Sequence, residues 1–236
     1  MTSQTDANGT AARTGARLVV GLLGVLAVGV VAVPLALLVR GGYGPLLGVD
    51  RDASAWAERA VSGSPALLRL AEAVTLLGDP VGITVVAAVL ALVLWRRGMH
   101  RLALYVVAAR VGALVLSQGL KHLVDRARPV FDVPVAEALG PSFPSGHALG
   151  SAVFWTTCAM LLMPRVRRPL LLLAGAVLVA VAVSASRVLL GVHFLSDVTG
   201  GLLLGLGWAA VCTAVFVLER AEQGEPVDVE REGIGT

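Results

Sequence analysis

His193 and Asp197 stand four residues apart near the end of the chain. On a helix this spacing places two side chains next to each other on one face. The carboxylate can then accept a hydrogen bond from one ring nitrogen, so that the other nitrogen is free to act as a nucleophile. Arg187 precedes the pair, and a break in the chain at Gly191 would let Arg187 and His193 reach one pocket. These residues indicate a histidine nucleophile beside a cation.

A second group of polar residues, Pro144-Ser145-Gly146-His147, precedes an apolar run. Ser145 is a good N-cap residue, so the group predicts the start of a helix. The backbone N–H groups of Gly146 and His147 would then point toward an anion, with help from the helix dipole. Gly146 would allow that anion to approach the backbone closely.

Lys121 and Arg128 form the third group, seven residues apart. A helix that continued through both would place them on one side. The three groups together supply cations, backbone donors, two histidines and a carboxylate, which are the requirements of phosphoryl transfer. The sequence contains no carboxylate cluster of the kind that holds Mg²⁺ or Ca²⁺. We therefore expect the cations to stabilise the phosphate without a metal ion.

The composition indicates a membrane protein. Of the 236 residues, 56% are hydrophobic and 15% are charged, which is too little polar surface for a soluble domain of this size. The net charge is only +3 and the basic residues form no stripe, so a nucleic-acid-binding protein is not expected. Cys158 and Cys212 fall inside apolar runs, where they are interpreted as small buried side chains rather than zinc ligands.

Six apolar runs approach the length that crosses about 30 Å of hydrocarbon; they cover residues 18–39, 81–95, 102–124, 148–163, 170–185 and 198–218. The first run is longer than the apolar part of a cleaved signal peptide, so we expect a retained helix. Residues 40–79 mix charged and apolar types, which predicts short amphipathic helices at the membrane interface. The expected fold is an all-α bundle of six transmembrane helices, with these interfacial helices between the first and second spans.

The ends of the chain are polar and lack periodicity. We expect a domain over residues 17–218, flanked by disordered tails at 1–16 and 219–236. Arginines gather on one side of the six-span arrangement, at Arg13, Arg17, Arg96, Arg97, Arg101, Arg165, Arg167 and Arg168. Short arginine-rich loops stay in the cytoplasm. The expected protein is a multi-pass protein of the cell membrane with both termini in the cytoplasm. Segments 40–79, 125–146 and 187–197, which hold nearly all of the unusual polar residues, then face outward together.

The three groups also resemble the signature motifs of a known family. Lys-x6-Arg-Pro from Lys121, Pro-Ser-Gly-His from Pro144 and Ser-Arg-x5-His-x3-Asp from Ser186, in this order, resemble those of the type-2 phosphatidic acid phosphatase superfamily. That superfamily includes lipid phosphate phosphatases, bacterial phosphatidylglycerophosphate and undecaprenyl pyrophosphate phosphatases, and the vanadium haloperoxidases. All eleven signature positions are present with the family spacing. Each motif alone is weak, but the ordered set is specific.

The resemblance implies a role for each residue. His193 would be the nucleophile that forms a phosphohistidine, Asp197 would orient it, and His147 would protonate the leaving oxygen and then activate water. The phosphate would be held by Lys121, Arg128, Arg187, Ser145 and Gly146. The implied substrate is a lipid phosphate or lipid pyrophosphate, such as phosphatidate, phosphatidylglycerophosphate or undecaprenyl pyrophosphate, which reaches the site from the bilayer. No cofactor is implied.

Several other polar residues lie close to these motifs. Arg110 falls in the middle of the third run, where we expect it to pair inward with Gln118 or a backbone carbonyl rather than to bind substrate. His122 and Arg126 match no signature position and are interpreted as interfacial residues. Glu72 and Asp79 could line the entrance to the site, which the sequence does not decide.

Three other functions compete with a lipid phosphatase. A vanadium haloperoxidase would use the same residues to hold vanadate, but the known ones are soluble, which six spans contradict. A lipid-phosphate binder or transporter would not need two histidines and an aspartate. Hydrolysis of a small soluble phosphate at the same site remains open.

Overall fold

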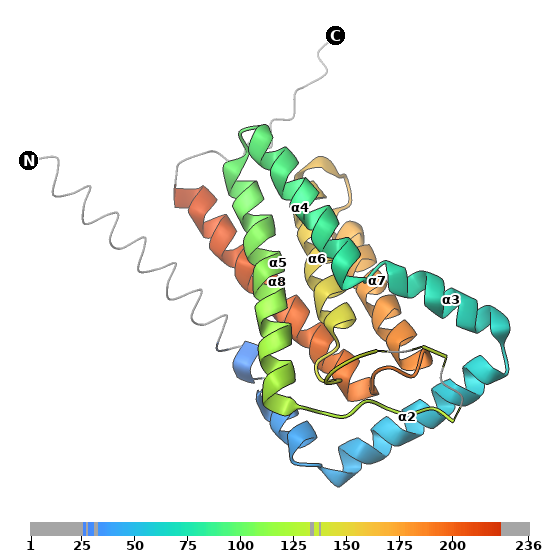
Figure 1. Ribbon diagram of the computed structural model, residues 1–236. Helices are drawn as coiled ribbons and strands as arrows, with labels where there is room; N and C mark the ends of the chain where they lie inside the picture. Colours follow the sequence, from blue (N-terminus) through green and yellow to red (C-terminus); the bar gives the residue numbers. More distant parts are fainter. Residues whose placement is uncertain (1–25, 27, 31–32, 133–134, 137, 223–236) are drawn as a thin grey trace, which may run out of the picture.

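The computed structural model describes residues 26, 28–30, 33–132, 135–136 and 138–222. The predicted tail 1–16, part of the first apolar run and residues 223–236 lie outside the described residues. The chain is all-α (Figure 1), and its elements are α2 (Gly44–Ser62), α3 (Pro65–Leu76), α4 (Pro80–Arg96), α5 (His100–Val124), α6 (Gly146–Leu162), the 3-10 turn η1 (Met163–Arg165), α7 (Pro169–Leu189) and α8 (Leu195–Glu222).

Local sequence chemistry sets where three of these helices begin. Ser64, Asp79 and Ser145 precede α3, α4 and α6, and each side chain accepts a hydrogen bond from the backbone N–H three residues later, at 3.3, 2.6 and 3.4 Å. These bonds satisfy N–H groups that have no partner within the helix. Pro65 and Pro80 occupy the first helical position, which needs no N–H donor. Asp79, whose role the sequence left open, is thus the cap of α4.

Five stretches are long and apolar enough to cross a membrane, and a sixth is reached only if Val28–Arg40 and Gly44–Ser62, bent by 84°, count as one span. The five are Pro65–Arg96, His100–Val124, Gly146–Arg165, Pro169–Leu189 and Leu195–Phe216. The chain is therefore a multi-pass membrane protein with five to six candidate spans. The predicted interfacial helices correspond to α2 and α3, but α3 joins α4 in one 32-residue candidate span, so an interfacial position of α3 stays a prediction.

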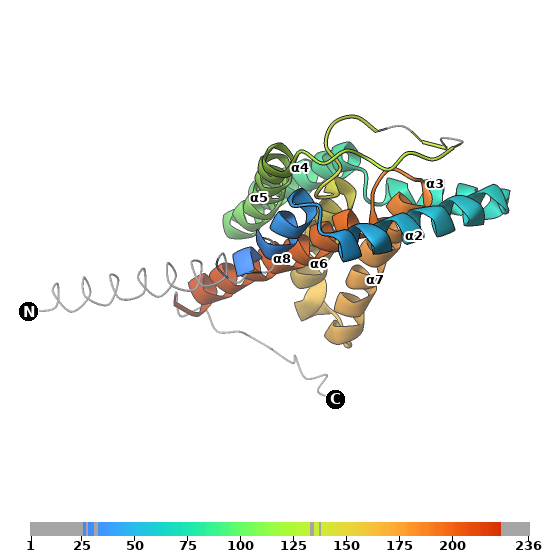
Figure 2. The ribbon, with the colours of Figure 1, turned by 90° about the horizontal axis from the view of Figure 1, so that it is seen from below.

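The long helices surround α6, which contacts α4, α5, α7 and α8. Figure 2 shows the same arrangement from below, with α2 and α3 extending beside the bundle. The outer surfaces are strongly apolar, with Val81, Val115, Leu170 and Leu178 exposed by 65–77%. Such exposure suits contact with lipid, whereas a soluble surface of this size would carry polar groups.

Glycines bring α6 and α8 into close contact. A Cβ atom added at Gly201 would lie 2.7 Å from the Ser145 carbonyl oxygen, and one added at Gly205 would lie 2.6 Å from the Leu149 carbonyl oxygen. Small residues spaced four apart allow two helix backbones to approach in this way. The backbone N–H of Ser145 also donates to the Asp197 carbonyl oxygen at 3.0 Å. The starts of α6 and α8 are therefore held side by side.

Candidate active site

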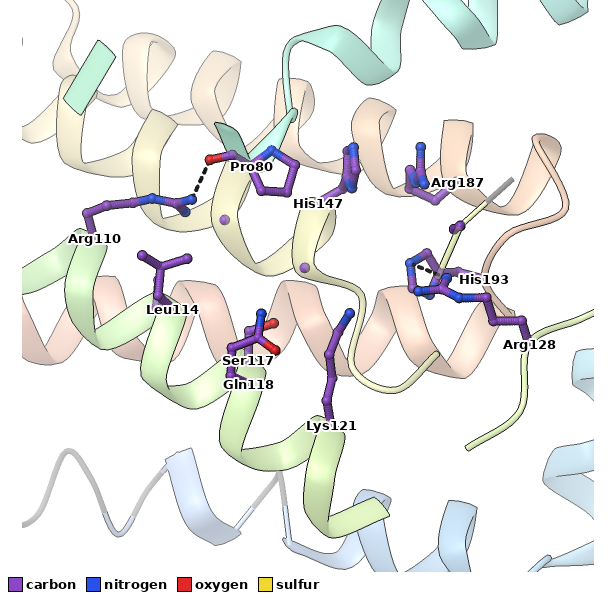
Figure 3. Close-up of a pocket in the computed structure, with 14 residues that line it drawn as sticks. Pro80, Arg110, Leu114, Ser117, Gln118, Lys121, Arg128, His147, Arg187 and His193 are labelled. Carbon is purple, nitrogen blue, oxygen red and sulfur yellow. Dashed lines mark hydrogen bonds between the residues drawn. The ribbon is translucent and has the colours of Figure 1, made fainter. Parts of the chain in front are cut away.

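The three residue groups meet at one cavity of about 170 Å³ between α4, α5, α6 and α7. Figure 3 shows its lining residues directed inward from these separate elements. Of the predicted site residues, the lining includes Lys121, Arg128, Gly146, His147, Arg187 and His193. Three distant parts of the chain are thus brought together, as their order and spacing predicted.

The other two predicted residues, Ser145 and Asp197, do not line the cavity. Both are fully buried, at 0% exposure. The Ser145 hydroxyl caps α6, and its contact with phosphate stays a prediction. Asp197 lies behind His193, which agrees with a residue that acts on the ring rather than on the phosphate.

The connection between α7 and α8 is shorter than the sequence indicated. Arg187 was expected in an outward segment, but it lies in the last turn of α7, which continues to Leu189. Asp197 was expected before the sixth span and lies instead in the first turn of α8. The turn needs Gly191, which has φ of +68° and would place a Cβ atom 2.6 Å from the Phe131 ring. This turn directs both Arg187 and His193 into the cavity.

The His193 ring is oriented by two neighbours. Its Nε2 atom lies 3.2 Å from Nη1 of Arg128, and a guanidinium can only donate, so Nε2 accepts and the ring proton is assigned to Nδ1. Nδ1 faces Oδ2 of Asp197 at 3.6 Å, slightly beyond hydrogen-bond range. Burial lowers the pKa of His193 to about 4, although the Asp197 carboxylate acts in the opposite direction. The ring is therefore neutral at physiological pH, with a lone pair on the cavity side.

Arg128 reaches the cavity from the loop that follows α5. This helix ends at Val124, where the third apolar run was predicted to end, and Asp125 has φ of +46°. Lys121 and Arg128 therefore do not share one helix face. Arg128 instead enters from the loop, where its guanidinium donates to the carbonyl oxygens of Gly140 at 2.9 Å and Val192 at 2.6 Å. Burial lowers the pKa of Arg128 from its usual value, while Asp197 raises it. Arg128 thus joins the α5–α6 loop to the α7–α8 turn.

Arg187 has a donor that the described residues leave unsatisfied. Its Nη1 atom donates to Thr75 Oγ1 of α3 at 2.9 Å. Its Nε atom is buried and has no hydrogen-bond partner in the described part of the chain. A buried donor without a partner is costly, so an anion in the cavity would relieve an existing penalty. Lys121 lines the same cavity from α5.

The start of α6 adds backbone donors to these side chains. Gly146 and His147 are its first two residues, and N–H groups at this position have no partner within the helix. The cavity therefore combines Lys121, Arg128 and Arg187 with a helix N-terminus and two imidazole rings, which suits a phosphoryl group. Within the described residues, no group of three or more His, Cys, Asp or Glu side chains is placed to hold a metal ion.

Arg126 was interpreted as an interfacial residue, and this was wrong. Its guanidinium is buried between two carboxylates, with Nη1 2.6 Å from Oδ1 of Asp197 and Nη2 2.6 Å from Oδ2 of Asp50. Asp50, from α2, also accepts hydrogen bonds from the backbone N–H and hydroxyl of Ser196. The ring of Phe194 packs against the guanidinium, and Cζ of Arg126 lies 4.1 Å from the ring centroid. Asp50 and Arg126 thus fix the carboxylate that faces the His193 ring.

The expected inward pairing of Arg110 is confirmed, with different partners. Its Nη2 atom donates to the Pro80 carbonyl oxygen at 2.7 Å and to Thr84 Oγ1 at 2.6 Å, and Nε donates to Thr84 at 3.0 Å. The backbone carbonyl was foreseen, whereas Thr84 takes the place proposed for Gln118. Arg110 also lines the cavity, which the sequence did not indicate.

Comparison with known proteins finds the same family in several ways. The profile of the PAP2 superfamily matches residues 101–220. The chain is 38% identical to phosphatidylglycerophosphatase B of Bacillus subtilis (strain 168) over 39% of this chain and 47% of that protein. It is 31% identical to lipid A 1-phosphatase of Rhizobium etli over 50% of this chain and 57% of that protein. The chain thus spans about half the length of these relatives.

A solved structure supports the same relationship over a longer part of the chain. It is the crystal structure of a transmembrane PAP2-type phosphatidylglycerolphosphate phosphatase from Bacillus subtilis. The two folds superpose with a TM-score of 0.69 at 25% identity, covering 80% of this chain and 94% of the other. The similarity therefore extends beyond the residues that carry the three motifs.

Proposed function

Because this chain belongs to the PAP2 superfamily, we propose that it is a membrane phosphatase that hydrolyses lipid phosphates or lipid diphosphates through a phosphohistidine. The unit responsible is the domain over residues 17–218, with six spans and with α2 and α3 near the interface. Phosphatidate, phosphatidylglycerophosphate and undecaprenyl pyrophosphate are the candidate substrates. The cavity opens at the outer face, where a head group can enter while its acyl or prenyl chains remain in the bilayer.

The first step transfers the phosphoryl group to the protein. Nε2 of His193 attacks phosphorus, an N–P bond forms, and the bond from phosphorus to the leaving oxygen breaks. A protonated His147 gives its proton to that oxygen. Lys121, Arg128 and Arg187 stabilise the charge on the equatorial oxygens, together with backbone N–H groups at the start of α6.

The second step regenerates the histidine. Neutral His147 removes a proton from water, the water oxygen attacks phosphorus, and the N–P bond breaks to release inorganic phosphate. Asp197 keeps the His193 ring in the required orientation through both steps. The cations provide the charge stabilisation that a metal ion supplies in many other phosphatases.

One arrangement carries this proposal: a buried imidazole presents Nε2 to a cavity that the cations Lys121, Arg128 and Arg187 also line. Nε2 of His193 faces Nη1 of Arg128 at 3.2 Å, and Nε of Arg187 is buried without a partner in the described part of the chain. A phosphate group would satisfy these donors while it meets the nucleophile.

Phosphate release by the purified protein in detergent tests the proposal. We expect hydrolysis of at least one of the three lipids in the presence of EDTA, and its loss by a factor of about 10³ or more in His193→Ala. Brief incubation with substrate labelled on the terminal phosphate should leave acid-labile label on the wild-type chain and none on His193→Ala. Activity that required added Mg²⁺ would contradict the proposed chemistry.

Three measurements on the same purified protein separate the competing functions. A binder would retain lipid phosphate without releasing phosphate, and a haloperoxidase would oxidise halide when supplied with vanadate and peroxide. A phosphatase for small soluble substrates would hydrolyse glycerol phosphate as well as the lipids, with no gain from the lipid chain.

A further inference from the structure

The cavity extends beyond the residues that the proposed reaction uses. From Lys121 its wall follows one face of α5 through Gln118, Ser117 and Leu114 to Arg110. The facing wall is α6, which contributes Gly146, His147 and Gly150. Figure 3 shows His193 and Arg128 at one end of this cavity and Arg110 at the other, with His147 between them.

Gly150 brings the Arg110 guanidinium close to His147. A Cβ atom added at Gly150 would lie 3.0 Å from Nη1 of Arg110. Gly150 follows His147 by three residues in α6, so the two lie on one face, about one helical turn (~5.4 Å) apart. The guanidinium therefore lies one turn of α6 beyond His147, on the side away from His193 (Figure 3).

The hydrogen bonds of Arg110 leave one nitrogen for a ligand. Nε and Nη2 hold Thr84 and the Pro80 carbonyl oxygen, which fixes the plane of the guanidinium against the start of α4. Nη1 makes no hydrogen bond to the part of the chain that the structure describes and points toward the side-chain-free surface of Gly150. The close approach at Gly150 alone would also suit a structural brace, whereas the position of Arg110 in the cavity wall brings the guanidinium within reach of a ligand.

We propose that Arg110 is a second phosphate-binding site, which receives a phosphate on the leaving-group side of the substrate. This inference rests on the proposed function and assigns a substrate class to it: lipids that carry two phosphates. With the terminal phosphoryl group at His193 and the leaving oxygen at His147, the next phosphate along the substrate reaches Nη1 of Arg110. Ser117 and Gln118 supply further polar groups to this part of the cavity.

A lipid diphosphate fits this arrangement chemically. The N–P bond to His193 forms as the bridging P–O bond breaks, and the bridging oxygen leaves on the inner phosphate with a proton from His147. Negative charge develops on that inner phosphate, where a guanidinium stabilises it in the transition state. Phosphatidylglycerophosphate also carries a second phosphate on this side, separated by a glycerol unit. Phosphatidate and undecaprenyl phosphate carry none.

Paired substrates with the same lipid chain provide the test. We expect Arg110→Gln to lower kcat/KM for undecaprenyl diphosphate by about 10- to 100-fold, the effect of one charge-assisted contact. For undecaprenyl phosphate the change should be at most about threefold. Phosphatidylglycerophosphate against phosphatidate forms a second pair. A lower kcat/KM of Arg110→Gln for undecaprenyl diphosphate alone identifies a site for the inner phosphate of a diphosphate. A lower kcat/KM for both undecaprenyl diphosphate and phosphatidylglycerophosphate identifies a site that accepts the second phosphate of either lipid.

The control variant is Thr84→Val, which removes a partner of Arg110 but keeps the guanidinium. It should leave the ratio of the two kcat/KM values within about twofold of wild type. If Arg110→Gln lowered kcat/KM equally for both members of each pair, or for neither, Arg110 would be a brace and the inference would be overturned. Gly150→Ala, which partly covers Nη1, should show the same selectivity to a smaller degree and serves if Arg110→Gln does not fold.

Binding of inorganic anions distinguishes failure of this inference from failure of the proposed function. Calorimetry on His193→Gln in detergent should show tighter binding of inorganic diphosphate than of phosphate, and Arg110→Gln in the same background should remove that difference. Equal binding of the two anions by His193→Gln would overturn the inference whatever the hydrolysis assays show. Absence of hydrolysis together with a diphosphate preference would overturn only the proposed reaction.

Discussion

At the scale of single residues, the environment of His193 follows from burial rather than from contact alone. The side chain is 2% exposed, and Nδ1 is separated from Oδ2 of Asp197 by 3.6 Å. Desolvation disfavours the charged ring and a nearby carboxylate favours it. The first effect is larger here, because the pKa falls to about 4. The proposed nucleophile is thus kept neutral, the form that the proposed reaction requires.

This pKa predicts a titration that NMR can follow. In protein labelled with ¹⁵N-histidine, the signal absent from His193→Gln should titrate with a midpoint near pH 4. Because the folded pKa lies below the unfolded value of about 6.5, the neutral ring stabilises the fold above that pH. This contribution is lost as the pH falls from about 6.5 through 4. A midpoint near pH 6.5 would show that the ring is solvated.

A second prediction concerns Arg126, whose guanidinium bridges Asp50 and Asp197. Lysine keeps the charge but cannot bridge two carboxylates in this geometry. We expect Arg126→Lys to lower kcat by about 10- to 100-fold with little change in KM, since Asp197 loses its fixed position while the phosphate-binding groups remain. Asp50→Asn should have a smaller effect in the same direction.

Arg40→Lys is the matched control, because among the described residues the Arg40 guanidinium has a single hydrogen-bond partner, the exposed Leu123 carbonyl oxygen. It should leave kcat within about twofold of wild type. A fall in the unfolding temperature of Arg126→Lys, with kcat of the folded protein unchanged, would assign Arg126 to stability alone.

At the scale of elements, the contact between α6 and α8 positions the two halves of the site. Gly205 packs against the Leu149 carbonyl oxygen so closely that a Cβ atom would lie at 2.6 Å. A backbone carbonyl cannot move aside for a new Cβ atom as a flexible side chain can, so α6 and α8 would have to separate.

We therefore expect Gly205→Ala to lower the free energy of unfolding by about 1–3 kcal/mol and to reduce activity as His147 moves away from His193. Thermal unfolding in detergent and phosphate release measure the two effects. Gly175→Ala is the control, because no atom of the residues that the structure describes lies within 4 Å of its added Cβ atom. Equal unfolding temperatures for the two variants would contradict the close packing of α6 on α8.

At the same scale, the helices predicted from the sequence agree best with the structure where contact with lipid requires a long apolar run. Apolar runs 102–124 and 170–185 correspond to α5 and α7, because a helix in hydrocarbon needs a nearly continuous apolar surface. The end of α7 was less predictable than that of α5, whose last residue, Val124, is also the last residue of its apolar run. Arg187 lies beyond the apolar run 170–185 and remains helical, where its Nη1 atom donates to Thr75 Oγ1 of α3.

The sequence predicted the reactive residues of the site, because they occur as reactive types at fixed spacing. It did not predict that Arg110 lines the cavity, nor that Asp50 and Arg126 hold Asp197. Asp50 and Arg126 act through contacts between distant segments, and an arginine in a polar loop looks the same whether it is buried or solvated. Asp50 is the residue that could have revealed this pair. If residues 44–62 pack against the core, the buried Asp50 carboxylate needs a cation such as Arg126 beside it.

At the scale of the whole molecule, the antiparallel helices separate two ends. The turns after α4 and η1, which hold the arginine clusters, lie at one end, and the α5–α6 and α7–α8 connections lie at the other (Figure 1). The positive-inside rule predicts that the arginine end is cytoplasmic. The cavity would then open on the opposite side of the membrane.

Cysteine labelling of intact cells tests this orientation. In a background with Cys158 and Cys212 replaced by alanine, Leu139→Cys should react with an impermeant maleimide, because Leu139 is 94% exposed in the α5–α6 loop. Arg167→Cys, in the turn before α7, should react only after the membrane is permeabilised. The reverse pattern would place the cavity on the cytoplasmic side.

The helices α2 and α3 limit which chimaeric proteins can remain active. Asp50 of α2 reaches Asp197 through Arg126, and Thr75 of α3 holds Arg187. A chimaera that exchanged residues 44–76 for those of a homologue would replace both partners at once. Such a graft retains turnover only when the donor segment brings an acid and a hydroxyl to the same two places, so these helices are not an interchangeable specificity module.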